Sequence, residues 1–340
     1  MEATKKAAQV RSEIIRSQSL YLKEFEAKEV ADSRGQRFFS GTRFKSLAVP
    51  FLYRLIRQVP LPIAMLPINL FIFIMRALYW WPKNPIRLSC EYICILAKQK
   101  GHTHNPQQIY QQFLSNALES LKNYFDLYRN GIESVIDQVN IAENDALKIN
   151  KLIGEYGGAV LAVPHNLGSL FSAIKMNREF PLIIVTKNPS TIERTKIAID
   201  FYERMDTTIL MVRGGNPFEL SRTLFSVLKS GKMVGATVDS LDSSENRIEV
   251  QVFGQTMGFS AWAAKIAIRV GVPIIPSYFG SRKNQINAVY ADPILTNDLQ
   301  ESIQQYVSFF EENILKDPAS WGFLGDKKWR RALRGACDNL

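Results

Sequence analysis

Histidine and cysteine are scarce in this chain of 340 residues, with three of each. Cys90, Cys94 and Cys337 have no metal-binding spacing. Cys90 and Cys94 are four residues apart in a helical pattern, so two apolar thiols are expected on one helix face. This cysteine usage excludes a cysteine-based metal site and fits a reducing compartment.

Several sequence features are missing. The first forty residues have no apolar segment followed by small residues, so we expect no secretory signal. Internal repeats and low-complexity tracts do not occur. No nucleic-acid-binding module or stacking motif is recognisable either, so we do not expect the chain to bind nucleic acid despite its formal charge of +10. An anionic lipid or an acidic carrier protein remains as the acidic partner.

The chain has enough hydrophobic residues to form a large core. Hydrophobic residues make up 46% of the chain and aromatic residues 11%, which excludes global disorder. The length allows one large domain or two smaller ones.

The N-terminal part indicates a membrane. Residues 1–46 are basic with interspersed apolar side chains, which fits either an amphipathic surface helix or a solvated tail. Residues 59–81 are the most apolar stretch, and Tyr79-Trp80-Trp81 resembles an interfacial aromatic belt. Three prolines in this stretch argue against a straight spanning helix. We expect a membrane-embedded or re-entrant anchor rather than a soluble core helix, within a membrane-associated segment 47–84.

Residues 86–130 predict amphipathic helices, whose apolar stripe is most simply core packing. His102 and His104 lie in a turn by composition, and no nearby acid or cysteine cluster completes a metal site. We therefore expect neither a metal nor a cofactor.

After residue 150, short apolar strands alternate with helical segments. Strands are expected at 159–163, 182–185, 208–212, 233–237 and 272–278, and helices at 192–205, 218–228 and 261–270. Alternation of this kind predicts an α/β fold with a largely parallel, mixed sheet flanked by helices. We assign residues 85–335 to this domain.

His165 directly follows the first of these strands, in the turn Pro164-His165-Asn166. Asn166 is placed to cap the helix that follows. A histidine at a strand-to-helix turn faces the carboxyl edge of the sheet, where open α/β folds bind ligands. Two interpretations stand: a general base, or a histidine that only forms hydrogen bonds within the turn.

Several motifs occur in a fixed order along the chain. They are the strand-end His165, Asn188-Pro189 before a helix ending in Arg204, Arg222-Thr223-Leu224, the strand leading into Asp239, Val252-Phe253-Gly254, Pro318-Ala319-Ser320-Trp321 and Lys328-Trp329-Arg330. In this order and spacing, residues 85 to 331 resemble the late, acyl-carrier-dependent lipid A biosynthesis acyltransferases of the lysophospholipid acyltransferase superfamily. The resemblance implies the α/β fold of that superfamily.

One departure from the family pattern concerns the catalytic acid. The family's histidine is followed four or five residues later by Asp or Glu, whereas Ser169 and Leu170 stand here. Asp239 is the best candidate to replace that acid, because it ends a strand at the same sheet edge and matches a family aspartate. The alternative for Asp239 is a structural role as a cap of a loop or helix. Glu193 is a weaker candidate for the acid.

The resemblance also implies residues that bind substrate. Arg204 matches a family arginine near an acidic headgroup, and guanidinium groups bind phosphate in a bidentate way. The remaining candidates are Asn166, Asn188, Arg213 and Arg222. For the arginines, the alternative is a solvated surface cation.

We therefore expect a membrane-associated O-acyltransferase on the cytoplasmic face of a bacterial inner membrane. It would move a fatty acyl group from acyl-carrier protein or acyl-CoA to a hydroxyl of a glycolipid or phospholipid acceptor, of lipid A type. The missing acid supports one alternative: a catalytically silent relative that binds lipid or a membrane partner.

Overall fold

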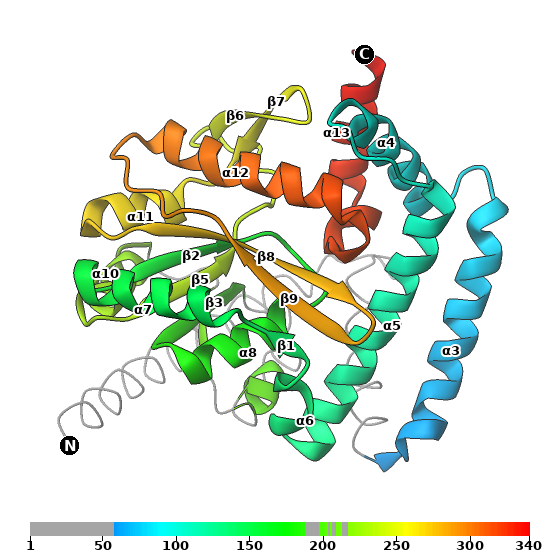
Figure 1. Ribbon diagram of the computed structural model, residues 1–340, viewed down its shortest axis with the longest axis horizontal. Helices are drawn as coiled ribbons and strands as arrows, with labels where there is room; N and C mark the ends of the chain where they lie inside the picture. The colour runs from blue at the N-terminus through cyan, green and yellow to red at the C-terminus, as the bar shows by residue number, and fades with distance from the viewer. Residues whose placement is uncertain (1–57, 188–196, 203–204, 206–208, 213–216) are drawn as a thin grey trace, which may run out of the picture.

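The computed structural model describes residues 58–187, 197–202, 205, 209–212 and 217–340. The basic segment 1–46 of the sequence analysis lies outside these residues. Figure 1 shows an α/β body with one helix, α3, along its edge.

The body is built on a seven-stranded sheet in the order β1-β9-β8-β2-β5-β3-β4. The strands are β1 (Val139–Asn140), β2 (Ala159–Val163), β3 (Leu182–Lys187), β4 (Ile209–Val212), β5 (Met233–Thr237), β8 (Ile274–Arg282) and β9 (Gln285–Tyr290). Neighbouring strands are parallel except in the β8–β9 hairpin. A separate antiparallel pair consists of β6 (Ile248–Val252) and β7 (Gln255–Phe259). The expected largely parallel, mixed sheet is confirmed.

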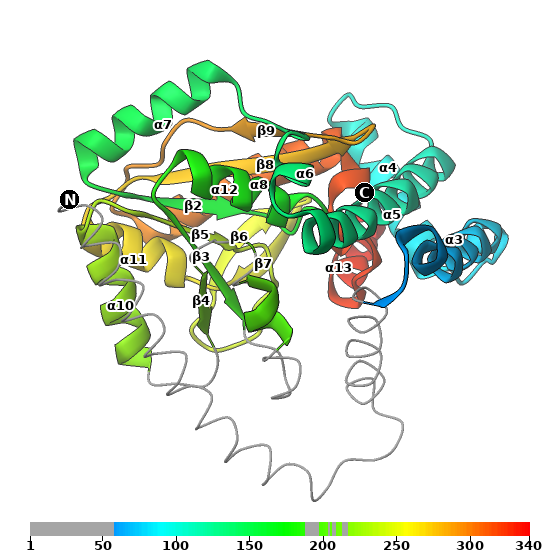
Figure 2. The ribbon, with the colours of Figure 1, turned by 90° about the horizontal axis from the view of Figure 1, so that it is seen from below.

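Helices cover both faces of this sheet (Figures 1 and 2). The described helices are α3 (Leu61–Ala77), α4 (Pro85–Gln99), α5 (Pro106–Asn130), α6 (Glu133–Ile136), α7 (Glu143–Tyr156), α8 (Ser169–Glu179), α10 (Pro217–Lys229), α11 (Trp262–Val270), α12 (Leu299–Lys316) and α13 (Lys327–Asp338), with short 3₁₀ turns η1 (Leu78–Trp80), η2 (Pro318–Ser320) and η3 (Gly322–Gly325). Of the expected helix 192–205, the described residues 197–202 are helical.

Strand β2 shows why a continuous apolar run is needed at the centre of the sheet. All five of its residues are buried. Val160 and Ala162 pack into the cluster that contains α11 and α12, whereas Leu161 and Val163 pack into the cluster that contains α7 and α8. Successive side chains of a strand point to opposite faces. A strand that is covered on both faces therefore needs apolar residues at every position.

Gly158, directly before β2, is required by close packing. Its φ is +153°, and a Cβ there would lie 2.8 Å from the carbonyl oxygens of Leu228 and Lys232. Its neighbour Gly157 also has positive φ, +71°, but its Cβ would meet open space.

We expect Gly158→Ala to destabilise the fold more than Gly157→Ala. The second change costs only the left-handed backbone penalty of about 1–2 kcal/mol. The first adds overlap with two backbone carbonyls, which costs a further ~1–3 kcal/mol because backbone must shift. Urea unfolding followed by circular dichroism gives both values, and equal midpoints for the two variants would contradict this account.

Helix α3 differs from the expectation drawn from its prolines. It runs unbroken from Leu61 to Ala77, with Pro62 in its first turn and Pro67 inside it. Pro62 removes no hydrogen bond, because the first N–H groups of a helix have no intrahelical acceptor. With η1 it forms a 20-residue helix, Leu61–Trp80, of mean hydropathy 1.9, which by length and composition could cross a membrane. The prolines therefore do not interrupt the helix.

Candidate active site

His165 and Asp239 are brought together by the register of two parallel strands. In the pairing of β2 with β5, Val163 lies opposite Thr237. His165 and Asp239 each follow two residues later, beyond the carboxyl ends of their strands. The N–H of Val238 donates to the carbonyl of Val163 at 2.9 Å, so the pairing continues just past the strand ends. Two residues that are 74 positions apart in sequence thus become neighbours at one sheet edge.

The His165 ring contacts the Asp239 carboxylate through Nδ1 and Oδ1. A carboxylate can only accept, so Nδ1 carries the proton and Nε2 presents a lone pair. The Thr237 hydroxyl lies 3.1 Å from Nε2 and donates to it in this tautomer. About a third of the His165 side chain is exposed, whereas that of Asp239 is 2% exposed. This is the arrangement of a base with its orienting acid: the acid is buried, and the basic nitrogen is within reach of a ligand.

Two tryptophans hold Asp239 in place. Trp321 Nε1 donates to the second carboxylate oxygen, Oδ2, at 3.0 Å, and Trp329 Nε1 donates to the Asp239 carbonyl at 3.1 Å. Both rings are buried, and their centroids are 5.1 Å apart in an edge-to-face contact. A buried carboxylate needs such donors, because its lost hydration must be replaced. With both oxygens bonded, the carboxylate has one orientation.

The turn that carries His165 is fixed by the segment around η2 and η3. The Leu167 N–H donates to the Ser320 carbonyl at 3.0 Å, and the Gly322 N–H donates to the His165 carbonyl at 2.5 Å. The Phe323 ring stacks on the imidazole, with centroids 4.1 Å apart and an interplanar angle of 29°. The backbone of His165 is thus held by hydrogen bonds, and its ring is held at Nδ1 and on one face.

Tyr278, on β8, fixes the other end of this segment. Its hydroxyl donates to the Asp317 carbonyl at 2.7 Å, and the Ser320 hydroxyl donates to the Asp317 carboxylate at 2.6 Å. Burial raises the pKa of Tyr278 well above its ordinary value and raises the pKa of Asp317 as well. The tyrosine therefore remains a neutral hydrogen-bond donor at any working pH. These bonds fix the segment around η2 that packs behind the His165 turn.

Gly322 leaves no room for a side chain next to His165. A Cβ on Gly322 would lie 2.8 Å from the His165 carbonyl oxygen, whereas one on Gly325 would make ordinary contact with Ile86 at 3.4 Å.

We expect Gly322→Ala to lower the catalytic rate while the protein stays folded, because the new methyl group displaces the His165 backbone. A shift of about 1 Å in a catalytic group costs on the order of 10²-fold. Gly325→Ala is the matched control and should keep the wild-type rate. Comparing kcat of the two variants at equal melting temperature tests this, and two equal rates would show that His165 tolerates the displacement.

The structure also places three other residues named from sequence. The Asn166 side chain is buried: its Oδ1 accepts from the Phe279 N–H at 3.2 Å and its Nδ2 lies 3.5 Å from the Ser320 carbonyl. Ser169 accepts from the Asn166 N–H at 3.0 Å, within the turn. Arg222 is exposed on α10. These contacts give Asn166 a positioning role in the turn, and its role in substrate binding stays a prediction.

The other candidates cannot be placed. Asn188, Arg204 and Arg213, proposed to bind substrate, lie outside the described residues, as does the weaker candidate acid Glu193.

Sequence reasoning missed part of the site. Trp321 and Trp329 were noted only as parts of closing motifs, and Thr237 and Phe323 were not singled out. The Pro-x-x-Trp spacing was the available signal, but nothing in it shows that an indole N–H reaches a carboxylate 82 residues earlier in the chain.

Comparison with known proteins finds one matching family model and similar curated proteins. The sequence model described as bacterial lipid A biosynthesis acyltransferase matches residues 100–331. The chain is also similar to the phosphatidylinositol mannoside acyltransferase of two Mycobacterium tuberculosis strains, each 26% identical over 175 residues. That match covers 49% of this chain and 53% of each relative, so it spans about half the length of those curated proteins.

Proposed function

Since this chain belongs to the bacterial lipid A biosynthesis acyltransferase family, we propose that it transfers a fatty acyl group to a hydroxyl of a lipid acceptor. The observation that supports this most is the contact of His165 with the buried Asp239, whose second oxygen accepts from Trp321. A histidine with an orienting acid is the group that deprotonation of an alcohol requires near neutral pH.

The proposed chemistry is acyl transfer from a thioester. Nε2 of His165 takes the proton of the acceptor hydroxyl while the oxygen attacks the thioester carbonyl, displacing the Thr237 hydroxyl as the partner of Nε2. The tetrahedral intermediate collapses, the C–S bond breaks and the thiolate takes the proton back from the imidazolium. Asp239 stabilises the imidazolium between these steps, which is the role of the acid in the serine-protease triad.

Charge and family support the proposed donor and acceptor. Acyl-carrier protein is acidic and CoA is phosphorylated, so the net charge of +10 suits either donor. We propose a glycolipid acceptor of the lipid A type, bound with help from Arg204, Arg213, Arg222 and Asn188. The relatives' name gives them a mannosylated lipid, which is also a glycolipid with free hydroxyls.

We propose that the protein works at the cytoplasmic face of the bacterial inner membrane. In this division of the chain, residues 85–335 form the catalytic domain, and residues 47–84 associate with the membrane. Residues 1–46 add basic charge at an anionic leaflet, where each cation near the surface contributes about 1 kcal/mol. Helix α4 begins at Pro85, where the proposed domain begins.

The alternative of a catalytically silent relative loses its main support. That alternative rested on the absence of an acid four or five residues after His165. Asp239 supplies a carboxylate at Nδ1 from the neighbouring strand instead.

The test is acyl transfer by the purified full-length chain in lipid vesicles. Radiolabelled palmitoyl and myristoyl chains would be offered as CoA thioesters and as acyl-carrier-protein thioesters, each with glycolipid and phospholipid acceptors. We expect labelled product on a glycolipid, and the preferred thioester identifies the donor. Lipid binding without product from any combination would instead favour the silent relative.

A further inference from the structure

Helix α3 packs on α5 through a regular apolar seam. The seam residues recur at alternating spacings of four and three and are at least partly buried: Leu61, Met65, Ile68, Ile72, Met75 and Tyr79. At one end, Met65 packs with Phe125 near the end of α5. At the other end, the Arg76 guanidinium donates to the Ser115 hydroxyl in the first half of α5 at 3.0 Å. The two helices are therefore antiparallel neighbours along most of α3 (Figure 1).

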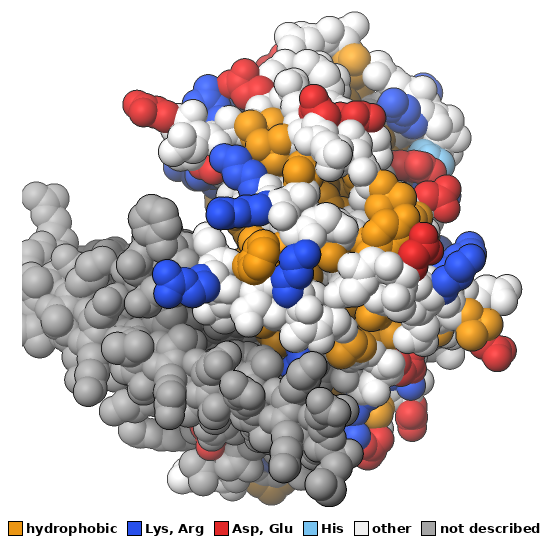
Figure 3. Space-filling view, turned by 90° about the vertical axis from the view of Figure 1, so that its left-hand side faces the viewer, with side chains coloured by type: hydrophobic (Ala, Val, Ile, Leu, Met, Phe, Trp, Pro, Cys, Tyr) orange, Lys and Arg blue, Asp and Glu red, His pale blue; other side chains and the backbone are white. Residues whose placement is uncertain are grey.

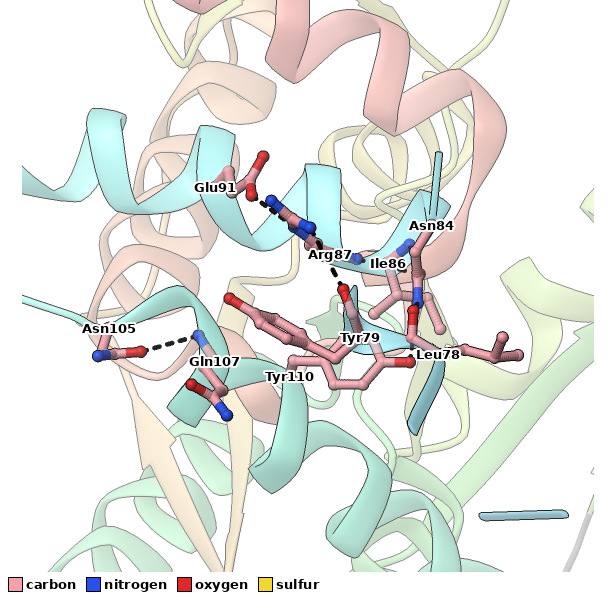
Figure 4. Close-up of polar contacts among 9 residues, drawn as sticks. All are labelled: Leu78, Tyr79, Asn84, Ile86, Arg87, Glu91, Asn105, Gln107 and Tyr110. Carbon is pink, nitrogen blue, oxygen red and sulfur yellow. Dashed lines mark hydrogen bonds and ion pairs between the residues drawn. The ribbon is translucent and has the colours of Figure 1, made fainter. Parts of the chain in front are cut away.

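Hydrogen bonds join the end of α3 and the turn after it to α5 and to the start of α4, and Figure 4 shows those around Asn84. The Tyr110 hydroxyl donates to the Met75 carbonyl at 2.5 Å and accepts from Asn84 Nδ2 at 2.9 Å. Asn84 Nδ2 also lies 2.9 Å from the Leu78 carbonyl, and its Oδ1 caps the first turn of α4. Asn84 is 1% exposed and Tyr110 is fully buried, so opening this junction would leave buried polar groups unpaired. The direction of α3 is thus set by α5.

The rest of the α3 surface is apolar. Its only polar side chains, Asn69 and Arg76, are seven residues apart and share one edge. Large hydrophobic side chains cover the outer face and continue past the end of the helix: Ile63, Leu66, Leu70, Phe71, Phe73, Ile74, Leu78, Trp80 and Trp81, each at least 38% exposed. By contrast, the described part of the face in Figure 3 mixes charges of both signs with apolar side chains. A helix that is apolar beyond its packing seam needs a second apolar environment.

A bilayer fits this surface better than a protein partner does. Nearly all of the exposed face is aliphatic or aromatic, and it includes Trp80 and Trp81, a residue type that is enriched at membrane–water interfaces. Arg76, on the polar edge, is placed to meet lipid phosphates, and the chain carries a net charge of +10.

Crossing the bilayer is incompatible with the packing of α3 on α5. Along its length α5 carries Glu119, Lys122, Asp126 and Arg129, and it packs against the α/β body. If α3 spanned the bilayer while docked, α5 would enter the hydrocarbon beside it, where charged side chains are costly. With α3 in the membrane plane, α5 stays on the protein side.

We propose that α3 lies in the plane of one leaflet, its outer face immersed and its seam on α5, and does not cross the membrane. This inference rests on the membrane location proposed above but not on acyl transfer. It would hold the His165 edge of the body at a fixed height over the lipid surface.

Depth measurements on two positions of α3 test the orientation. Ile63 and Ile74 are eleven residues apart, so they lie about 16 Å apart along the axis and within ~20° of the same face. Single cysteines at these positions, in a chain with Cys94→Ser and Cys337→Ser, would carry an environment-sensitive fluorophore. Cys90 is left in place because burial raises the pKa of its thiol and keeps it unreactive. Vesicles of phosphatidylethanolamine and phosphatidylglycerol, brominated at defined acyl positions, report depth by quenching.

We expect equal depth at Ile63→Cys and Ile74→Cys, and no quenching at Leu147→Cys, an exposed leucine on α7. Leu66→Cys and Phe73→Cys, about 10 Å apart on one face, provide a second pair if a label disturbs the first. Depths that differ by about the axial separation would show a spanning helix and overturn the proposal, as would absence of quenching in vesicle-bound protein. Failure of the protein to sediment with vesicles would refute the membrane location itself, whatever the result of the transfer assay.

Discussion

Replacing His165 by alanine is expected to reduce acyl transfer by about 10²–10⁴-fold, because a positioned general base contributes that much. The loss should appear in kcat with little change in KM, since the imidazole acts on the proton in transit rather than on bound substrate. The measurement is steady-state transfer to the acceptor identified in the vesicle assay. About a third of the His165 side chain is exposed, so added imidazole should enter the gap and restore part of the rate.

His102→Ala is the matched control for this variant. His102 lies in the turn after α4, and its ring stacks on His104 rather than on the site. It should keep the wild-type rate. A His165→Ala protein with full activity and a normal melting temperature would remove the base assignment. Rescue by imidazole distinguishes a lost base from a distorted turn, because a distorted turn has no vacancy for the added ring to fill.

The strands at the centre of the sheet were predictable because burial on both faces gives unambiguous apolar runs. Strands β2 and β5 have the predicted bounds, 159–163 and 233–237. Their neighbour β3 ends two residues later than predicted, and β8 begins two residues later and ends four residues later. Knowing that both strands are parallel neighbours is enough to place Asp239 near His165, since both follow the carboxyl ends. The family pattern alone would have missed this acid, because that pattern seeks it along the helix.

Other features depend on tertiary contacts that no local pattern reports. Strand β9 alternates in burial and pairs through a two-residue turn in which Lys283 and Asn284 both have positive φ. Only Asn is a familiar residue in such a turn, so the hairpin signal was weak. The contact of Trp321 with Asp239 joins segments 82 residues apart and depends on how η2 packs on the sheet. Pro67 was misleading because a helix tolerates one lost hydrogen bond when one of its faces packs on a neighbouring helix, as that of α3 does on α5.

Asp239→Asn is expected to lower kcat by about 10⁴-fold, as the equivalent change does in the serine-protease triad. The reason lies in the second partner of the carboxylate. Trp321 Nε1 donates to Oδ2 at 3.0 Å, so the carbonyl oxygen of an asparagine must face the indole and its NH2 group must face His165. Nδ1 then has to accept, the proton moves to Nε2, and the base is lost although the side chain keeps its shape.

Asp292→Asn, at an exposed position after β9, is the control and should be silent. Wild-type activity in Asp239→Asn, with His165→Ala inactive, would show that the acid does not orient the ring.

If Asp239 acts by orienting the ring and not only through its charge, a second substitution should partly restore the activity of Asp239→Asn. In the double variant Asp239→Asn with Trp321→Phe, no indole N–H holds the amide oxygen, and the amide can turn its carbonyl toward Nδ1–H. Both amide orientations then leave one polar group without its bond, so they become similar in energy. The productive tautomer regains a substantial population, and we expect the double variant to be at least ~10-fold faster than Asp239→Asn, a coupling that a double-mutant cycle measures. Trp321→Phe alone should be slower than wild type, because Asp239 loses a donor. If instead the two losses multiply, the contribution of Asp239 is its charge and not the tautomer that it selects.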